Sequence, residues 1–291
     1  MRFMQPSSWR EALEMKAAAP EAMPIAGGTD VMVEINFDRH RPEAVIDLTR
    51  VRDLNDWGPD DGRIRVGAGV SYTRIIAELG DRLPGLAMAS RTVGSPQIRN
   101  RGTVGGNLGS ASPAGDAHPP LLASGALVEV ESVGGSRRLP AREFFVGPKR
   151  HAMRPDELIA AFLIEPSRGP QQFSKVGTRN AMVIAVCSFG LALDAQRRRV
   201  GTGIGSAGPT PLRAEAAERF LEGALEEARL WETKAAMPAA INSKFGELAA
   251  EAARPIDDVR GTAAYRRRAL AVMAARTLAW AWDEYRGGGN A

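Results

Sequence analysis

Two glycine-rich stretches contain the residues whose types and spacing could do chemistry. The longer one, residues 99–109 (RNRGTVGGNLG), holds four glycines, two arginines, two asparagines and a threonine. Glycine lets a backbone turn tightly and lets another group approach it closely. Successive backbone N–H groups in such a turn form a concave anion site, and Arg99 and Arg101 raise the local positive potential. The stretch therefore predicts a loop that holds a phosphate or a diphosphate.

The shorter stretch, residues 24–30 (PIAGGTD), repeats the same chemistry upstream. Each stretch has a Gly-Gly pair with a hydroxyl residue nearby, Thr29 in one and Thr103 in the other, so the two could hold a diphosphate from both sides. Neither matches the G-x-G-x-x-G fingerprint or the G-x-x-x-x-G-K-[ST] phosphate loop. A nicotinamide-binding Rossmann domain and a nucleoside triphosphatase are therefore disfavoured.

Candidate side chains outside these stretches are few. Asp116 follows the central stretch closely and could accept a ribose or ribityl hydroxyl, or it could only cap the helix that follows. Lys175 ends a predicted strand, where a solvated lysine is the common case. The three histidines lack metal-ligand spacing, and no G-x-S-x-G nucleophile elbow is present. We therefore predict no catalytic side chain and no metal site, and expect a bound cofactor to supply any chemistry.

Composition narrows the class of protein further. The 291 residues carry a net charge of +4 with only 6% aromatics, which disfavours a nucleic-acid-binding surface. The single cysteine, Cys187, cannot form an internal disulfide or supply the thiolates of an iron–sulfur cluster. The sequence has neither a signal segment nor an apolar run long enough to span a membrane. We therefore expect a cytoplasmic protein.

The elements that must position these residues follow from hydrophobic patterning. The first part of the chain alternates short strands and helices, and each Gly-Gly pair lies near a strand–helix junction. Strands are predicted at 22–25, 44–48, 63–70, 126–131, 158–164, 172–176, 181–194 and 200–204. Helical spacing follows over 214–240, with a candidate break at Gly223, and over 262–285. This change in character predicts two domains, residues 1–176 and 177–291.

With both stretches in place, the chain resembles the FAD-binding medium subunit of the molybdenum hydroxylases, the family of carbon monoxide dehydrogenase and xanthine dehydrogenase. The resemblance rests mainly on AGGTD at 26–30 and QIRNRGTVGGN at 97–107. The segment DDVRGTAAYRR at 257–267 is similar to the family's C-terminal signature, so the resemblance covers nearly the whole chain.

This resemblance implies an α+β fold, with a two-part FAD-binding domain of the vanillyl-alcohol-oxidase or PCMH type. A C-terminal α+β domain with a small antiparallel sheet and helices would follow. The implied function is electron transfer in a heteromeric molybdenum hydroxylase: FAD accepts electrons from the [2Fe–2S] clusters of a small partner subunit and passes them to an external acceptor. A large partner subunit would hold the molybdenum cofactor, in a dimer of heterotrimers. The acceptor stays open among a quinone, a cytochrome, oxygen and NAD.

The resemblance also implies which residues contact FAD. Both stretches would hold its diphosphate through backbone N–H groups and Thr and Asn side chains, and Asp116 would accept a ribityl or ribose hydroxyl. Lys175 would lie near the isoalloxazine, with Ile159 near the flavin or adenine and Ile184 over one flavin face. The implied contacts are Ile25, Ala26, Gly27, Gly28, Thr29, Asp30, Thr103, Val104, Gly105, Gly106, Asn107, Asp116, Ile159, Lys175 and Ile184.

Two other functions compete with this one. A stand-alone flavin reductase of the same fold, such as the enolpyruvyl-UDP-N-acetylglucosamine reductase, would need an acid near the flavin and a basic pocket for a nucleotide sugar, and no matching segment is present. A non-catalytic module that binds a phosphate ligand would have lost flavin. The two complete Gly-Gly pairs argue against that loss, because glycine is costly to keep where nothing requires it.

Overall fold

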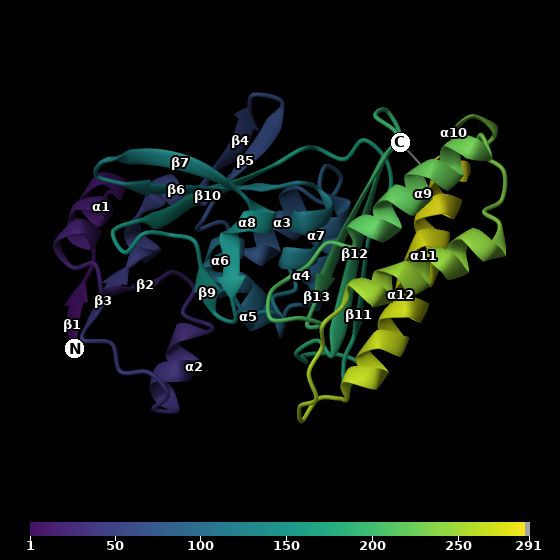
Figure 1. Ribbon diagram of the computed structural model, residues 1–291. Coiled ribbons are helices and arrows are strands. Elements are labelled where there is room, and N and C mark those ends of the chain that lie inside the picture. The colour runs from purple at the N-terminus through teal and green to yellow at the C-terminus, as the bar shows by residue number, and fades with distance from the viewer. Residues whose placement is uncertain (289–291) are drawn as a thin grey trace. The chain divides into compact units, whose positions relative to one another are not determined.

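Figure 1 shows the computed structural model, which describes residues 1–288. The chain folds into two compact units, and each is built from three segments. Unit 1 comprises Met1–Glu78, Gly94–Ser112 and Ala126–Glu165, and unit 2 comprises Leu79–Val93, Pro113–Gly125 and the chain from Pro166 onward. Residues 289–291, the end of the predicted second domain, lie outside the described part of the chain. The predicted boundary after residue 176 stays a prediction.

Unit 1 contains two principal sheets. The first is parallel, with the order β1 (Arg2–Met4), β3 (Ala44–Asp47) and β2 (Met23–Ile25). The second is antiparallel, with the order β4 (Trp57–Asp60), β5 (Arg63–Gly67), β10 (Leu158–Ile164), β6 (Leu127–Ser132) and β7 (Gly135–Pro140). Its central strand β10 reads LIAAFLI and is buried along its whole length, as expected of a strand covered on both faces.

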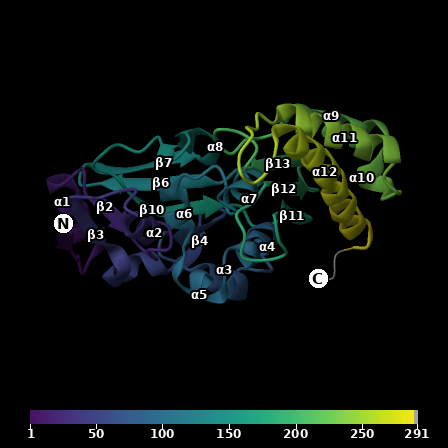
Figure 2. The same ribbon diagram turned by 90° about the horizontal axis from the view of Figure 1, so that it is seen from below.

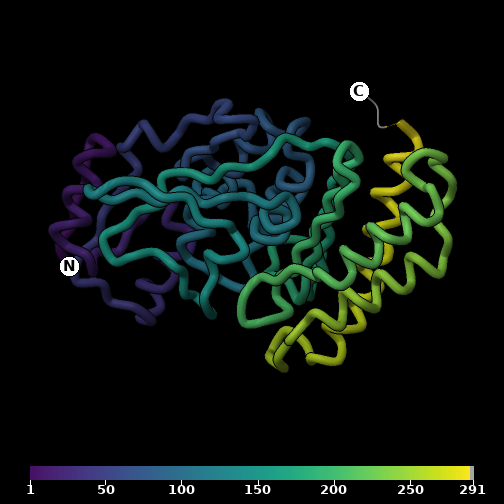
Figure 3. Tube along the Cα trace, turned by 45° about the horizontal axis from the view of Figure 1, so that its top comes forward, coloured from purple at the N-terminus to yellow at the C-terminus, as the bar shows by residue number. Residues whose placement is uncertain are grey.

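Short helices and turns complete unit 1. The helices are α1 (Trp9–Ala18), α2 (Val31–Asn36), α3 (Tyr72–Glu78), α5 (Pro96–Arg101), α6 (Val104–Ser110) and α8 (Ala141–Phe144). Two 3₁₀ turns at Leu48–Arg50 and Arg52–Asn55 follow β3, and a hairpin pairs β8 (Phe145–Gly147) with β9 (Arg150–His151). The trace in Figure 3 shows the N-terminal segment beside β6, where the Trp9 indole donates to the Glu131 carboxylate at 2.8 Å.

Unit 2 is built on one antiparallel sheet, β11 (Gln171–Val176), β12 (Cys187–Asp194) and β13 (Arg199–Gly205). Its helices are α4 (Pro84–Thr92), α7 (His118–Ala123), α9 (Glu215–Glu227), α10 (Leu230–Thr233), α11 (Ala239–Ala252) and α12 (Ala263–Arg286). Figures 1 and 2 both show α9, α11 and α12 together on one side of this sheet.

Alternation along β12 and β13 explains how helices cover both faces of this sheet. Phe189, Leu191 and Leu193 belong to the core formed with α9, α11 and α12. Because successive side chains point to opposite faces, Gly190 faces the other way, toward α7. A Cβ on Gly203 would lie 2.0 Å from the Pro119 carbonyl oxygen, so the helix that follows Asp116 rests directly on the backbone of the sheet.

Three local predictions were wrong. The stretch 99–109 is mostly helical, in α5 and α6, because its glycines accommodate close packing rather than forming one open loop. Residues 181–186 are not strand: Met182 and Ile184 are exposed there, and Met182 has a left-handed φ of 50°. Helix α9 continues through Gly223, whose surroundings are open to solvent.

Candidate functional site

The two glycine stretches meet within unit 1. A Cβ on Gly27 would lie 1.9 Å from the carbonyl oxygen of Arg101 and 3.0 Å from the nitrogen of Gly102. The chain can pass so closely only where residue 27 has no side chain. Residues 101 and 102 immediately precede Thr103, so this backbone contact brings the two glycine stretches together.

The first stretch connects β2 to α2 and presents unused donors. The backbone N–H groups of Gly27, Gly28, Thr29 and Asp30 donate no hydrogen bond to any part of the chain that the structure describes. Gly28 has a φ of 74°, a value that favours glycine. Four consecutive free N–H groups around a left-handed residue form the kind of concave donor array that receives an anion. Ile25 ends β2 and Ala26 follows it into this turn.

The second stretch begins at a well-formed helix cap. The Thr103 hydroxyl accepts a hydrogen bond from the Gly106 N–H at 2.8 Å, which starts α6. Gly105 lies on the backbone of residue 68, where a Cβ would be 2.5 Å from the Ala68 carbonyl oxygen. The Thr103 hydroxyl therefore accepts a hydrogen bond at the start of the helix and keeps its own proton for donation, and Gly106 is the exposed glycine of the pair.

Other predicted residues of unit 1 fall around this helix. Val104 is buried, whereas Asn107 is partly exposed. Ile159, on β10, is 9% exposed, and its Cδ1 would lie 3.6 Å from a Cβ on Gly109. Ile159 therefore packs against α6, and a direct contact of Ile159 with a cofactor stays a prediction. Arg99 donates to the Gly94 carbonyl oxygen at 3.0 Å, and Arg101 is exposed.

Unit 2 contains the predicted polar pair. Lys175 Nζ, at the end of β11, lies 2.5 Å from Asp116 Oδ2, and the two side chains are 9% and 8% exposed. The Thr92 hydroxyl donates to the same carboxylate oxygen at 3.1 Å, and the Thr92 carbonyl accepts from Lys175 at 3.2 Å. The structure thus joins two residues that were predicted separately, 59 positions apart in the sequence.

The second oxygen of this carboxylate is the chemically informative atom. Asp116 Oδ1 is buried and has no hydrogen-bond partner within residues 1–288. Burial raises the pKa of the Asp116 carboxyl, although Lys175 and the Thr92 hydroxyl both act to lower it. A buried acceptor without a donor is costly, and a ligand hydroxyl would satisfy it.

Ile184 lies in the segment between β11 and β12, also in unit 2. Its residue is 53% exposed, so a large apolar side chain is available for contact with a flat apolar surface. Arg179 shapes this segment internally, donating to the Ala181 carbonyl at 3.1 Å and also to the Met182 carbonyl. A role for Ile184 as cover of a flavin stays a prediction.

Sequence reasoning missed two participants. Thr92 ends α4 and holds both partners of the ion pair, yet no motif in its neighbourhood singles it out. The Arg101 carbonyl group sets how closely the first stretch can approach the second. The position of a backbone group is not visible in the sequence, except through a glycine such as Gly27 that packs against it.

Among the described residues, no helix is both long and apolar enough to cross a membrane.

Comparison with known proteins identifies the family. The FAD-binding domain of molybdopterin dehydrogenases matches residues 1–166, and the C-terminal domain of the CO dehydrogenase flavoprotein matches residues 172–281. The nicotinate dehydrogenase FAD-subunit of Eubacterium barkeri is 34% identical over 236 residues, covering 76% of this chain and 79% of the relative. The nicotine 6-hydroxylase medium subunit of Paenarthrobacter nicotinovorans is 30% identical over 292 residues, 96% of each chain.

Solved structures agree with this assignment. The reconstituted CO dehydrogenase of Oligotropha carboxidovorans contains a chain that is 26% identical, with a TM-score of 0.87, covering 97% of this chain and 98% of that one. The predicted α+β fold class, an FAD-binding domain followed by a C-terminal domain, is confirmed. This chain therefore belongs to the family of FAD-binding oxidoreductase subunits found in the molybdopterin dehydrogenases.

Proposed function

We propose that this chain is the FAD-carrying electron-transfer subunit of a heteromeric molybdenum hydroxylase. The observation that carries the proposal is the array of four free N–H groups at Gly27–Asp30, packed against the start of the second glycine stretch in a chain of this family. Bound FAD would supply the redox chemistry, accepting electrons from partner [2Fe–2S] clusters and passing them to an external acceptor. The residues of this chain bind and orient it.

The glycine stretches fit a diphosphate. Backbone N–H groups carry partial positive charge and can donate hydrogen bonds to phosphate oxygens without a side-chain cation. Thr29 is partly exposed beside the array, and its hydroxyl donates no hydrogen bond within the described chain. We assign the diphosphate to the residues Ile25, Ala26, Gly27, Gly28, Thr29, Asp30, Thr103, Val104, Gly105, Gly106 and Asn107.

The polar pair of unit 2 fits a polyol. Asp116 Oδ1 can accept one hydroxyl, while Lys175 and Thr92 hold the other carboxylate oxygen. A ribityl or ribose chain offers such hydroxyls, and the geometry then makes Lys175 the support of the acceptor. We also assign Lys175 to the surroundings of the isoalloxazine, Ile184 to one flavin face and Ile159 to the flavin or adenine.

Relatives suggest the partners. The nicotine 6-hydroxylase relative is named a medium subunit, and another P. nicotinovorans relative is named a subunit of a 6-hydroxypseudooxynicotine dehydrogenase complex. We infer a small [2Fe–2S] subunit and a large molybdenum-cofactor subunit for this chain, assembled as a dimer of heterotrimers in the cytoplasm. Co-expression with the two partners and measurement of the mass of the purified complex tests this assembly.

The decisive experiment for the cofactor is a binding comparison between FAD and FMN. FMN carries the same isoalloxazine, ribityl chain and first phosphate but lacks the second phosphate and the adenosine, so the comparison measures what these two groups contribute together. We expect the purified chain to quench FAD fluorescence on binding, to release FAD on denaturation, and to bind FMN at least about 100-fold more weakly, since several charge-assisted hydrogen bonds are lost.

Other outcomes would redirect the assignment. Equal affinity for FAD and FMN would mean that neither the second phosphate nor the adenosine is bound, and the assignment of a diphosphate to the glycine stretches would fail. A folded chain that binds ADP but neither flavin, alone or with co-expressed partners, would favour the non-catalytic phosphate-binding module. Oxidation of a nicotinamide by the isolated flavin-loaded chain, coupled to reduction of an enolpyruvyl nucleotide sugar, would favour the stand-alone reductase.

A further inference from the structure

One buried arginine near the start of α12 links segments that are distant in the sequence. Arg266 is 4% exposed. Its Nη1 donates to the carbonyl oxygens of Val186 at 2.9 Å and Ser206 at 2.6 Å, and its Nη2 donates to Asp258 Oδ1 at 2.5 Å. A single guanidinium therefore fixes the start of β12, the end of β13 and the turn before α12.

The contact with Val186 closes the segment that contains Ile184. The Val186 N–H donates to the Val176 carbonyl at 2.8 Å, so this residue forms the base of the excursion from 177 to 185. Lys175 directly precedes Val176, the other partner of this hydrogen bond, on β11. By donating to the Val186 carbonyl oxygen, Arg266 fixes the C-terminal end of the segment 177–185, two residues after Ile184.

The contact with Ser206 leads to Asp116. The Ser206 N–H donates to the Pro113 carbonyl at 2.8 Å, and Ser206 has a left-handed φ of 56°. Pro113 lies three residues before Asp116, at the start of the segment that enters α7. Because Ser206 donates to Pro113, the contact between Arg266 and Ser206 also fixes the start of the segment that contains Asp116.

We propose that Arg266 is a positioning residue for the flavin-facing segments of unit 2, the one that carries Asp116 and the one that runs from Lys175 to Ile184. The proposal rests on the proposed function for the identity of the ligand. Arg266 itself contacts two backbone carbonyls and a carboxylate within the C-terminal part of the chain, so it acts through those segments.

The geometry of the contacts favours arginine. A guanidinium presents donors on separate nitrogens in a rigid plane, so Nη1 and Nη2 can serve three acceptors on three segments together, whereas the three donors of an ammonium share one nitrogen. Asp258 supplies the balancing charge, and its turn is closed by reciprocal backbone hydrogen bonds with Gly261. This gives a physical role to the sequence from 257 to 267: it brings a carboxylate to a buried arginine whose other contacts are backbone.

The single cysteine provides an independent readout. Cys187 is fully buried and directly follows Val186. Burial raises the pKa of its thiol to about 11, so it should react slowly with an aromatic disulfide reagent at neutral pH. Loosening the start of β12 would expose it, and no other thiol in the chain would contribute signal.

The test compares Arg266→Lys with the wild type and with Arg213→Lys. Arg213 is a matched control because it also pairs with a buried carboxylate in unit 2, Glu218, but this network leads to Thr202 in the middle of β13. We expect Arg266→Lys to weaken FAD binding about tenfold or more, as expected for loss of a charged hydrogen bond, to shift the flavin midpoint potential, and to speed labelling of Cys187.

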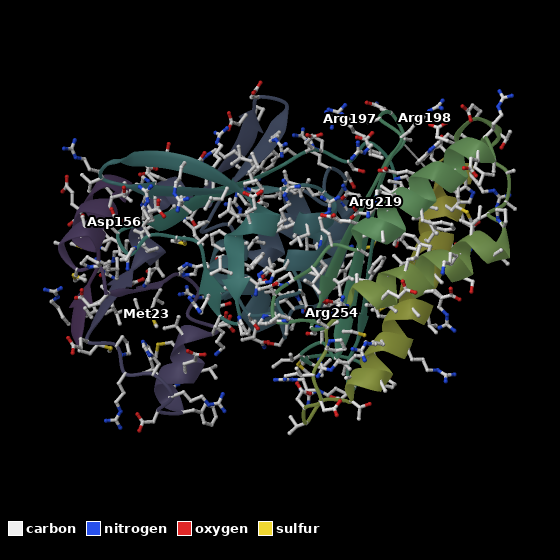
Figure 4. The ribbon with its side chains drawn as sticks, in the orientation of Figure 1. Met23, Asp156, Arg197, Arg198, Arg219 and Arg254 are labelled. Atoms are coloured by element: carbon white, nitrogen blue, oxygen red, sulfur yellow. The ribbon has the colours of Figure 1, made fainter. Side chains whose placement is uncertain are left out.

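The control should leave flavin affinity, midpoint potential and labelling near wild-type values. Figure 4 marks Arg197 and Arg198 in the turn that joins β12 to β13, so Arg197→Lys serves as a second control at the other end of the same hairpin. The backbone N–H of Arg254, also marked, donates to the Ala207 carbonyl oxygen at 2.7 Å. Arg254→Lys keeps this backbone contact and changes only the side-chain cation, so it serves as a further control.

The outcomes separate this proposal from the proposed function. Unchanged affinity, potential and labelling in Arg266→Lys would overturn it, and so would equal losses in Arg213→Lys, which would indicate general destabilisation. If Arg266→Lys does not fold, Asp258→Asn keeps the arginine and its carbonyl contacts, and a smaller change in the same three readouts is expected. If the wild type binds no FAD, either alone or with co-expressed partners, the proposed function fails, and Cys187 labelling still decides whether Arg266 holds these segments.

Discussion

The two groups of predicted contacts offer different chemical groups to a ligand. In unit 1 the glycine stretches offer backbone N–H groups, and their geometry depends on the absence of side chains at Gly27 and Gly105. In unit 2 the contact is a side-chain carboxylate, kept in place by the buried charge of Lys175. Changes that move the backbone in unit 1 should therefore affect binding about as strongly as folding, and changes in unit 2 should act on folding first.

The largest effect on stability is expected from Lys175→Met. This variant leaves the Asp116 carboxylate buried without its cation, and breaking a buried pair in this way costs about 3–5 kcal/mol. Urea denaturation of wild type and variant at neutral pH measures the change in the free energy of unfolding. Removal of both charges, in Lys175→Met with Asp116→Asn, should recover much of the loss. A double variant as unstable as the single one would show that packing of the lysine chain, and not its charge, carries the effect.

In unit 1, Gly27→Ala should weaken FAD binding directly, beyond what a general loss of stability would cause in a protein that stays folded. The added Cβ would lie 1.9 Å from the Arg101 carbonyl oxygen, so the two stretches must move apart, at a cost of about 1–3 kcal/mol in the free energy of unfolding. FAD affinity should fall by about 100-fold, because the donor array moves with the backbone. Fluorescence titration and urea denaturation measure the two quantities.

Gly58→Ala is the matched control for this variant. Gly58 also belongs to unit 1, and a Cβ there would meet nothing within 4 Å. Its FAD affinity and its free energy of unfolding should stay close to wild type. If Gly27→Ala loses stability and affinity in proportion, as a destabilised protein would, backbone recognition in unit 1 is not a separate property.

The comparison also explains what the sequence predicted. The glycine stretches were found because a close backbone approach leaves a local mark: only glycine fits where Gly27 meets Arg101 and where Gly105 meets Ala68. Helix α12 and strand β10 were found for a similar reason, since periodicity and a continuous apolar run are local properties.

The polar pair and its supports leave no local mark. Asp116 and Lys175 were each ambiguous in the sequence, and their pairing depends on how α4, α7 and β11 pack in unit 2. The error at 181–186 has the same origin: an apolar run was read as buried strand, whereas tertiary packing leaves Ile184 exposed. Arg266 was noticed only as part of a signature, and its contacts come from segments 60 and 80 residues away.

The pH dependence of stability tests which force dominates at Asp116. Burial raises the pKa of this carboxyl in the folded protein above its unfolded value of about 3.9, so its contribution to stability is complete below that value and is lost as pH rises through the folded pKa. Each unit of difference in pKa is worth about 1.4 kcal/mol. The stability of wild type relative to Asp116→Asn should therefore fall as pH rises above 4.

Urea denaturation of both proteins at a series of pH values from acid to neutral gives this difference directly. A difference that increases with pH would mean that attraction to Lys175 outweighs the cost of burial, which is the behaviour of an ordinary paired carboxylate. In that case the distinction between a backbone site in unit 1 and a side-chain site in unit 2 that is destabilised by burial would weaken.

The smallest effect is expected from Thr92→Val. The Thr92 hydroxyl lies 3.1 Å from Asp116 Oδ2 and 2.8 Å from the Ala89 carbonyl oxygen, and its one proton can serve only one of them at a time. Loss of a shared hydrogen bond should cost about 0.5–1.5 kcal/mol in the free energy of unfolding. The Thr92 carbonyl, which accepts from Lys175, is kept in the variant. A loss as large as that of Lys175→Met would make the hydroxyl, and not the ion pair, the element that keeps Asp116 in place.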